Sequence, residues 1–311
     1  MSFSTNHIAI LLAAYNGEKY IAQQLDSIIA QTCPDWELFI HDDGSGDATP
    51  AIIKKYAAVY PEQIHIIDAP STGSAKGNFL FLMREVDAPY IMFCDQDDVW
   101  NADKIECSLA ALKALEKKRG EDVPLLVFSD STVTDDELHV IDNSFLSYQN
   151  LDPKRLSFSE LMVQNVVPGN TAAFNRALLQ YARKCTDANA IIMHDWWCAL
   201  AGAYFGQIAF IEKSTLLYRQ HGENSLGAKK YLALKYPLDI LRCPGRIRDS
   251  FLTTRAQVGE FAKVFSLGTD SVPARYADKE SMNKWQRLRF YGQNGIRKTG
   301  LCRNIGFYFF G

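Results

Sequence analysis

The chain has 311 residues, 47% of them hydrophobic and 22% charged, a composition typical of an ordinary soluble enzyme with one large domain and an appendage. Its seven scattered cysteines, without CxxC spacing, exclude a disulfide framework and a zinc site and favour a cytoplasmic location. Residues 1–225 hold 17 Lys and Arg against 30 Asp and Glu, which makes nucleic acid a poor partner, whereas residues 226–311 hold 16 against 6.

The first half alternates short apolar runs with helical patterns. In residues 19–31, Ile21, Leu25, Ile28 and Ile29 form one helical stripe that can pack on a sheet. Strands are expected at residues 8–13, 37–41, 64–67, 90–94 and 125–129, and helices at residues 19–31, 49–60, 79–85 and 102–119. This alternation predicts an α/β fold with a doubly wound, mostly parallel sheet and crossover helices.

The regular alternation stops after residue 130. A polar stretch at 130–150 precedes a predicted strand at 171–174, and helices with Pro and Gly breaks are expected beyond 227. The longest apolar stretch, 191–211, contains His194 and Asp195, so it predicts a buried helix and strand and no membrane span. We also expect no signal peptide.

Acidic and glycine-containing segments follow three of the predicted strands. These segments are Ala13-Ala14-Tyr15-Asn16-Gly17, Asp42-Asp43-Gly44-Ser45 and Asp95-Gln96-Asp97-Asp98. In an open parallel sheet ligands bind beyond the carboxyl ends of the strands, so the three segments should converge at one edge. Carboxylates crowded there favour Mg²⁺ or Mn²⁺, whereas an isolated acidic cluster is also explained by a solvated loop or a helix cap.

Together with His194-Asp195-Trp196-Trp197, these segments resemble those of bacterial family-2 glycosyltransferases over residues 8–225. The resemblance implies the A-type nucleotide-diphospho-sugar fold, Rossmann-like with flanking helices, and an inverting mechanism. It places Tyr15 and Asp43 at the nucleobase, Asp95 and Asp97 at the metal with Asp98 as a third candidate carboxylate, and Asp195 as the catalytic base. Turn chemistry remains the alternative for Tyr15 and Asp43.

The expected site has four parts. Asp195 is the base, although the N-cap of a helix at 196–204 is the alternative for this residue. The metal, Mn²⁺ or Mg²⁺, is assigned to Asp95, Asp97 and His221, with a satisfied structural histidine as the alternative for His221. The nucleotide-sugar is assigned to Ala13, Tyr15, Asn16, Asp43, Lys76, Asp95, Gln96 and Arg219. The acceptor is assigned to Gly169, Asn170, His194, Trp196 and Trp197.

Lys76 belongs to a glycine-rich loop, 72–78, that suits phosphate, although a plain connector explains such a loop equally well. The segment Tyr218-Arg219-Gln220-His221 resembles rhamnosyltransferase-like members of the family. That resemblance suggests dTDP-rhamnose as the donor, with another dTDP- or UDP-sugar as the wider class, and a glycan or lipid-linked glycan of bacterial surface polysaccharide as the acceptor. The rival functions are a sugar nucleotidyltransferase and a non-catalytic sugar-nucleotide-binding protein at a membrane.

We divide the chain into a catalytic domain, 1–225, with a donor half at 1–130 and an acceptor half at 131–225, and a basic helical region at 226–311. This last region contains an apolar, basic segment from Lys229 to Arg248, and residues 281–311 carry six Lys and Arg and no acid. The pattern suits the anionic inner surface of the cytoplasmic membrane. Capping helices, with a homodimer contact, are the alternative.

Overall fold

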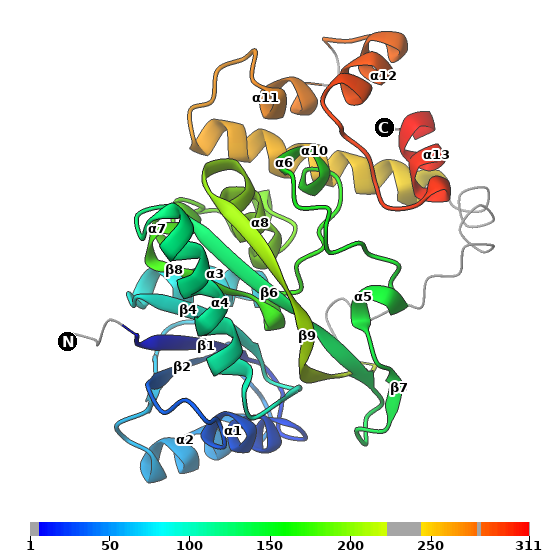
Figure 1. The fold of residues 1–311 in the computed structure, drawn as a ribbon. Helices are drawn as coiled ribbons and strands as arrows, with labels where there is room; N and C mark the ends of the chain where they lie inside the picture. The colour runs from blue at the N-terminus through cyan, green and yellow to red at the C-terminus, as the bar shows by residue number, and fades with distance from the viewer. Residues whose placement is uncertain (1–5, 223–243, 279–280, 311) are drawn as a thin grey trace.

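The computed structural model describes residues 6–222, 244–278 and 281–310 (Figure 1). The basic, apolar segment predicted between 229 and 248 therefore lies largely outside the described residues. No helix in the described part of the chain is both long and apolar enough to cross a membrane.

The first four strands form a parallel sheet, as predicted. Strand β1 (Ile8–Ala14) lies between β2 (Trp36–Asp42) and β4 (Tyr90–Asp95), and β3 (Ile64–Ile66) pairs with the outer side of β2. The connecting helices are α1 (Ile21–Ile29), α2 (Thr49–Val59) and α3 (Ala75–Glu85). In register, Ala13 pairs with both His41 and Asp95, which brings the ends of three strands to one edge.

Beyond β4 the sheet contains antiparallel as well as parallel pairs, so this half of the predicted mostly parallel sheet is mixed. Strand β8 (Ala173–Asn175) runs antiparallel between β4 and β6 (Leu125–Thr134). Strand β9 (Gln207–Arg219) pairs parallel with β6, while β5 (Val99–Trp100) and β7 (Val140–Asp142) pair antiparallel with β9 and β6. Alternating strands and helices predict that β4 and β6 pair with each other in parallel. Instead, β8 lies between them and runs antiparallel to both.

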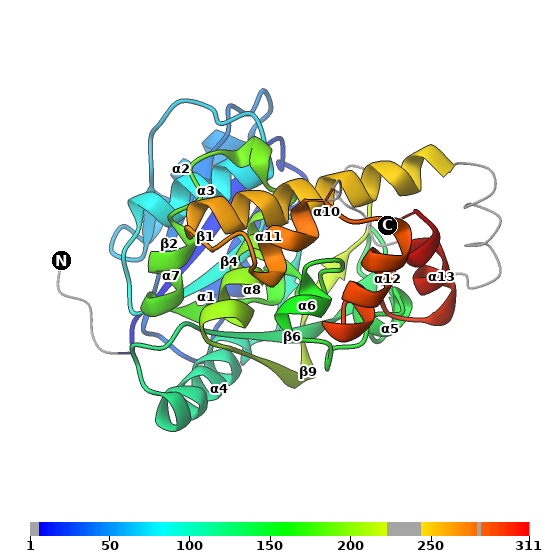
Figure 2. The ribbon, with the colours of Figure 1, turned by 90° about the horizontal axis from the view of Figure 1, so that it is seen from above.

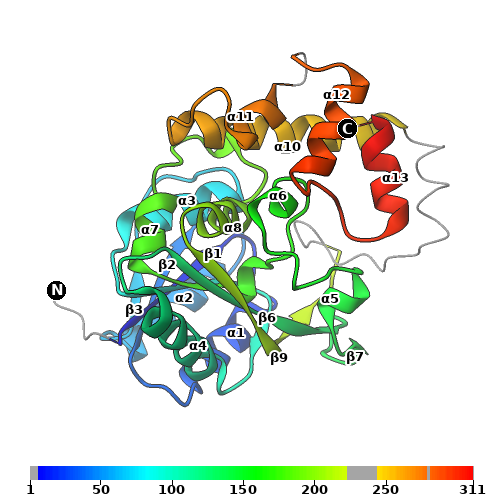
Figure 3. The same cartoon turned by 45° about the horizontal axis from the view of Figure 1, so that its top comes forward.

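Alternating strand residues bury two cores, one on each face of the sheet. Leu11 and Phe93 face one core, which receives α3 and α8 (His194–Phe205), whereas Leu12 and Met92 face the other core. That second core receives α1 and α4 (Lys104–Arg119). Figure 3 shows α3 and α8 on one side of the sheet and α1 and α4 on the other. The apolar stretch at 191–211 is α8 and the start of β9, so the prediction of a buried helix and strand is confirmed.

The C-terminal region is helical, as predicted, and shares the core of the main domain. Helix α10 (Pro244–Val264) places Phe251, Val258 and Phe261 in the core on the α8 side of the sheet. Helices α11 (Val272–Ala277), α12 (Lys284–Gln293) and α13 (Leu301–Phe310) follow it (Figure 2). Because Phe307 and Tyr291 belong to the same core, these helices are part of one packed body with the sheet.

Candidate active site

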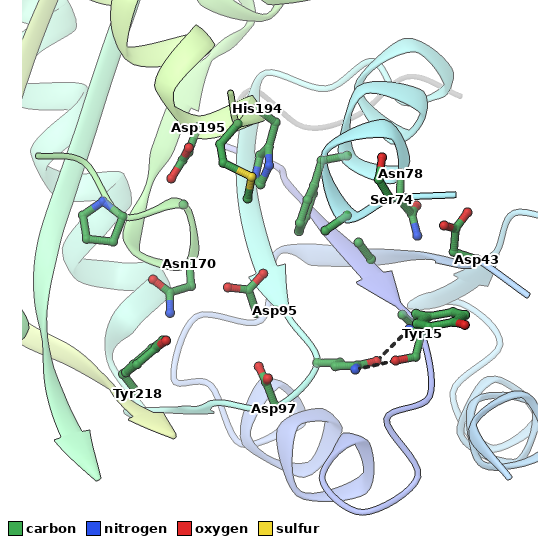
Figure 4. A pocket seen from close by; sticks show the side chains of 18 of the residues that line it. Tyr15, Asp43, Ser74, Asn78, Asp95, Asp97, Asn170, His194, Asp195 and Tyr218 are labelled. Atoms are coloured by element: carbon green, nitrogen blue, oxygen red, sulfur yellow. Dashed lines mark hydrogen bonds between the residues drawn. The ribbon is translucent and has the colours of Figure 1, made fainter. Parts of the chain in front are cut away.

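A cavity of about 1250 Å³ opens at the carboxyl ends of β1, β2 and β4. Figure 4 shows Tyr15 and Asp43 at one end, Asp195 and Asn170 at the other, and Asp95 and Asp97 between them. The structure thus brings together most of the predicted site residues. Those that line the cavity are Ala13, Tyr15, Asn16, Asp43, Asp95, Gln96, Asp97, Gly169, Asn170, His194, Asp195 and His221.

A side-chain bridge joins the loop after β1 to the loop after β4. The amide of Gln96 donates from Nε2 to the Tyr15 carbonyl and accepts at Oε1 from the Tyr15 N–H, both at 2.8 Å. A Cβ on Gly17 would lie 2.4 Å from Oε1 of Gln96, so only glycine leaves room for this bridge. The bridge leaves the Tyr15 ring 57% exposed at the cavity, where it can stack on a flat base.

Asp43 lies at the same end of the cavity and is almost fully buried. One oxygen of its carboxylate accepts from the Thr72 N–H, and its backbone carbonyl accepts from Ser71 Oγ at 2.7 Å. These contacts tie the loop after β2 to the glycine-rich loop before α3. A carboxylate held in this way can accept a hydrogen bond from the imide N–H of a pyrimidine.

Two acidic groups, Asp95 and Asp97, lie at the centre of the cavity. Burial, with the nearby charges of Asp97 and Asp195, raises the pKa of Asp95 to about 7. Asp97 contacts His221, with 2.8 Å between Oδ2 and Nε2, so residues 124 positions apart meet here. Carboxylates this close repel each other unless a cation neutralises them.

A divalent ion fits the chemistry of this group, because Asp95, Asp97 and His221 offer oxygen and imidazole ligands. In the described part of the chain, no group of three or more His, Cys, Asp or Glu side chains is placed so that it could hold a metal ion by itself. A divalent ion at this group would need further ligands, such as the diphosphate oxygens that Mg²⁺ and Mn²⁺ commonly bind.

Asp98 differs from its two neighbours because it turns away from the cavity and is fully buried. Its carboxylate accepts from Asn170 Nδ2 at 2.5 Å and from the Arg219 N–H at 3.2 Å. These contacts point to a structural role for Asp98, whereas Asp95 and Asp97 line the cavity.

Lys104, which sequence reasoning missed, lies fully buried beneath the acidic cluster. Its ammonium donates to the Asn170 carbonyl at 2.8 Å and lies 4.7 Å from the centre of the Trp100 ring. Burial lowers the pKa of Lys104 to about 8, although Asp98 and Asp95 oppose the shift. Lys104 is the first residue of the charged helix α4. A buried lysine at such a position looks the same in sequence as a solvent-exposed lysine, so its burial is seen only in the structure.

Asp195 lies in the first turn of α8, and the N-cap is Met193, so the N-cap interpretation of Asp195 is wrong. Burial raises the pKa of the Asp195 carboxyl to about 7, against hydrogen bonds from the N–H groups of Trp196 and Gly169. A Cβ on Gly169 would lie 3.4 Å from Asp195 Oδ2, so the two segments pack closely. The carboxylate faces the cavity in a setting poor in water, which suits a general base.

His194 precedes Asp195 in the first turn of α8, and its ring packs between two phenylalanines. Its ring stacks on Phe79 with 3.9 Å between centroids and meets Phe93 edge to face at 4.6 Å. Neither ring nitrogen has a hydrogen-bond partner in the structure, and burial lowers the pKa of His194 to about 3. The histidine is therefore neutral and contributes mainly an apolar surface next to Asp195.

Four predicted site residues do not reach the cavity. Trp197 is fully buried and donates to the Ala182 carbonyl, and Trp196 donates to the Leu161 carbonyl, so both are core residues and not acceptor ligands. The Lys76 ammonium donates to the Ile191 carbonyl at 2.8 Å, away from the phosphate position expected for it. The order of neighbours in sequence does not reveal which way a helical side chain points.

Arg219 is the fourth. Its guanidinium donates to the carbonyls of Asp97, at 2.9 Å, and Asp136, and to Gln23 Oε1 at 2.5 Å. It is almost fully buried and does not line the cavity. Arg219 thus braces the loop that carries Asp97, and its expected contact with the nucleotide-sugar is not seen.

Similarities to known proteins agree with this geometry. The dTDP-rhamnosyl transferase RfbG of Shigella flexneri is 32% identical over 237 residues, which cover 72% of this chain and 76% of that protein. Two solved structures share the fold with TM-scores of 0.53: S. aureus TarS 1-349 in complex with UDP and the mannosyltransferase PcManGT of Pyrobaculum calidifontis with GDP-Man and Mn²⁺. They are 15% and 17% identical and cover 97% and 93% of this chain, and 90% and 73% of their own.

Residues 9–180 match the family described as Glycosyl transferase family 2. The expected fold, an A-type α/β sheet with flanking helices and a helical C-terminal region, is confirmed by these similarities and by the strand order. Because the family match covers more than half of the chain and a relative is 32% identical over 72% of it, the chain belongs to glycosyltransferase family 2.

Proposed function

We propose that this protein transfers rhamnose from dTDP-rhamnose to a hydroxyl group of a bacterial surface glycan or its lipid-linked precursor, with inversion at the anomeric carbon. The observation that carries the proposal is the placement of Asp95 and Asp97 between the Tyr15–Asp43 end and the Asp195 end of one cavity. Similarity to a dTDP-rhamnosyl transferase supports the choice of donor.

In this proposal Tyr15 stacks on the thymine and Asp43 accepts its imide N–H, so the nucleotide lies at the ends of β1 and β2. Asp95, Asp97 and His221 would hold a Mn²⁺ or Mg²⁺ ion, and such an ion would supply positive charge to the departing diphosphate. The Gln96 bridge keeps the loop after β1 in place against the metal-binding loop.

Asp195 takes the proton of the acceptor hydroxyl as its oxygen attacks the anomeric carbon. The proton passes to the Asp195 carboxylate, the new C–O bond forms, and the bond to the diphosphate breaks on the opposite face. A single base across the sugar from the leaving group gives inversion in one displacement. General-base assistance of this kind typically contributes ~10²–10⁴-fold in rate.

Calorimetric titration with dTDP-rhamnose, dTDP-glucose, UDP-glucose and UDP-N-acetylglucosamine, with and without Mn²⁺, tests the donor. We expect dTDP-rhamnose to bind most tightly and only when the metal is present. NMR of the sugar released or transferred should show the anomer opposite to that of the donor. Tighter binding of a UDP-sugar would overturn the choice of donor, and retention of the anomer would overturn the single displacement.

The proposal also places the protein at the anionic inner surface of the cytoplasmic membrane, where a lipid-linked acceptor is presented. The support is the excess of basic residues in 281–311 and two highly exposed apolar side chains there, Trp285 at 80% and Leu301 at 77%. We propose membrane binding in preference to a homodimer contact, because two copies of this basic surface would repel each other, whereas an anionic membrane attracts it.

A further inference from the structure

Part of the cavity is lined by an apolar wall that the assigned residues leave unused, and Figure 4 shows one of its residues, Tyr218, beside Asn170. Phe145, Leu151 and Tyr218 line this wall together with residues 166–168. The Phe145 and Tyr218 rings meet edge to face, 5.1 Å between centroids and 69° between planes. Three chain segments thus form the wall: residues 145–151, residues 166–168 and Tyr218 of β9. An aromatic pair lies within it.

The amide of Asn165 is bonded within its own segment. It donates to the Val167 carbonyl at 2.9 Å and accepts from the Val167 N–H at 3.0 Å. Val166 and Val167 are almost fully buried, so the wall presents mainly the half-buried side chains of Phe145, Leu151, Pro168 and Tyr218. Apart from Gln149 and the Tyr218 hydroxyl at its edge, this surface is carbon, unlike the carboxylate-rich donor end.

We propose that this wall is the acceptor subsite, and that it holds a hexopyranose ring with the ring's apolar C–H face against Phe145 and Tyr218. The inference rests on the proposed function. Residues 166–168 lead directly into Gly169, which packs closely against Asp195, so a sugar on the wall adjoins the base. An apolar surface with one polar group at its edge is typical of a site that orients a small ligand.

Helix α13 holds the wall from behind, which gives the C-terminal region a role in acceptor binding. Arg303 donates from Nη1 to the Asn150 carbonyl at 2.6 Å and from Nη2 to the Gln149 carbonyl at 2.7 Å. These carbonyls follow α5 (Phe145–Tyr148), and Figures 1 and 3 show α13 beside α5. Asn150 has a φ of 51°, a left-handed conformation that asparagine adopts more readily than most non-glycine residues.

A second link fastens the same region. The Thr299 N–H donates to Gln164 Oε1 at 2.7 Å, just before the valines of the wall. The C-terminal segment thus contacts residues 149–150 in one of the three wall segments and Gln164, which precedes a second. Arg303 is accordingly a positioning residue for the acceptor and is not a catalytic one.

The test uses the full chain with Mn²⁺ and the best donor from the calorimetric screen, and methyl glycosides of glucose, galactose, N-acetylglucosamine and rhamnose as acceptor probes. Phe145→Ala, Arg303→Ala and Arg303→Lys are compared with the wild type. Arg289→Ala is the matched control, because it removes an exposed arginine of α12. Transfer kinetics give the KM for each substrate, and saturation-transfer NMR with dTDP and Mn²⁺ reports which glycoside C–H protons touch the protein.

We expect Phe145→Ala and Arg303→Ala to raise the acceptor KM about tenfold, the size of effect that a lost aromatic contact produces, with the donor KM changed less than about twofold. Arg303→Lys should recover part of the loss and Arg289→Ala should match the wild type. In Arg303→Ala, amide exchange should quicken in residues 145–151 and stay unchanged in β1.

Two failures are distinguishable. If no donor is bound or hydrolysed but the glycoside signals depend on Phe145, the proposed function is wrong and the sugar site stands. If donor is turned over but no glycoside is bound or accepted, or Phe145→Ala leaves the acceptor KM unchanged, the acceptor subsite is wrong. Unchanged exchange in residues 145–151 would remove the positioning role of Arg303.

Discussion

Asp195 is held in a conformation that suits proton transfer, and substitution by asparagine tests that role. Asp195→Asn keeps the size and the hydrogen bond from the Trp196 N–H but cannot take a proton. We expect kcat to fall ~10²–10⁴-fold while donor affinity is retained. Steady-state kinetics and donor calorimetry measure the two effects. A near-normal kcat would show that another group is the base.

The same carboxyl makes a prediction about pH. Because burial raises its pKa to about 7, the base is protonated below that pH, and kcat should fall tenfold per unit as pH drops from 7 toward 5. Folding shows the opposite sign: between about 4 and 7 the folded state holds this proton more tightly than the unfolded chain does, so the free energy of unfolding declines as pH rises.

Asp195→Asn removes that decline. The difference in thermal midpoint, variant minus wild type, should therefore be larger at pH 8 than at pH 5. Thermal unfolding at the two pH values measures it, and a difference that does not change with pH would contradict the raised pKa.

Asp97 tests the metal through a different measurement. Asp97→Ala removes a carboxylate that contacts His221, so we expect turnover to be abolished and Mn²⁺-dependent donor binding to weaken at least tenfold, with the fold intact. Glu121→Ala, an exposed acid before β6, is the control and should behave as the wild type. Full activity of Asp97→Ala in chelator-treated buffer would rule out the metal mechanism.

At the scale of elements, the loop after β1 depends on the loop after β4 through one side chain. Gly17→Ala places a methyl group where Gln96 bridges to Tyr15, so Gln96 must swing away and free the Tyr15 loop. We expect dTDP affinity to fall about fivefold to tenfold with little change in the thermal midpoint. Gln96→Ala should do the same, and the double variant should be no worse than either single variant, because both act on one bridge.

The strand ends were predictable from the sequence, and their convergence followed from parallel pairing. Ala13, Asp43 and Asp95 each follow or end a buried strand, so the topology alone brings them to one edge. The mixed half was not predictable in this way, because β8 has only three residues and its direction depends on long-range pairing. Periodicity carries no information about such a reversal.

The direction in which side chains point was the second feature of the site that could not be predicted from the sequence. Trp196 and Trp197 follow Asp195 in sequence, but a helix turns successive side chains about 100° apart, so only Asp195 faces the cavity. Lys104 and Arg219 are distinguished by burial among polar partners, which no pattern of spacing reports. The resemblance to a family identified residues near the chemistry and could not separate those that touch substrate from those that brace the loops.

At the scale of the whole molecule, the C-terminal helices both complete the core and carry the exposed surface that we propose meets a membrane. Removing 281–311 would take the rings of Phe307 and Tyr291 out of the core. It would also uncover Phe251, whose ring packs on Phe307 at 5.5 Å, so a truncated chain would lose stability as well as charge. Substitutions on the exposed surface separate the two functions. Trp285 and Leu301 are suitable because they are the most exposed apolar side chains in the described part of this segment.

We expect the intact protein to co-sediment with vesicles of mixed anionic and neutral lipid at low ionic strength and to be released by ~0.5 M salt, since screening weakens attraction to the surface. Trp285→Ala with Leu301→Ser should weaken vesicle binding at least fivefold and leave the thermal midpoint and donor hydrolysis unchanged. Val59→Ser is the matched control, because Val59 is an apolar residue at the end of α2 that is 63% exposed, and this variant should bind like the wild type. Equal binding of all three proteins, or none at low salt, would show that this surface does not meet a membrane and would favour the capping and dimer role.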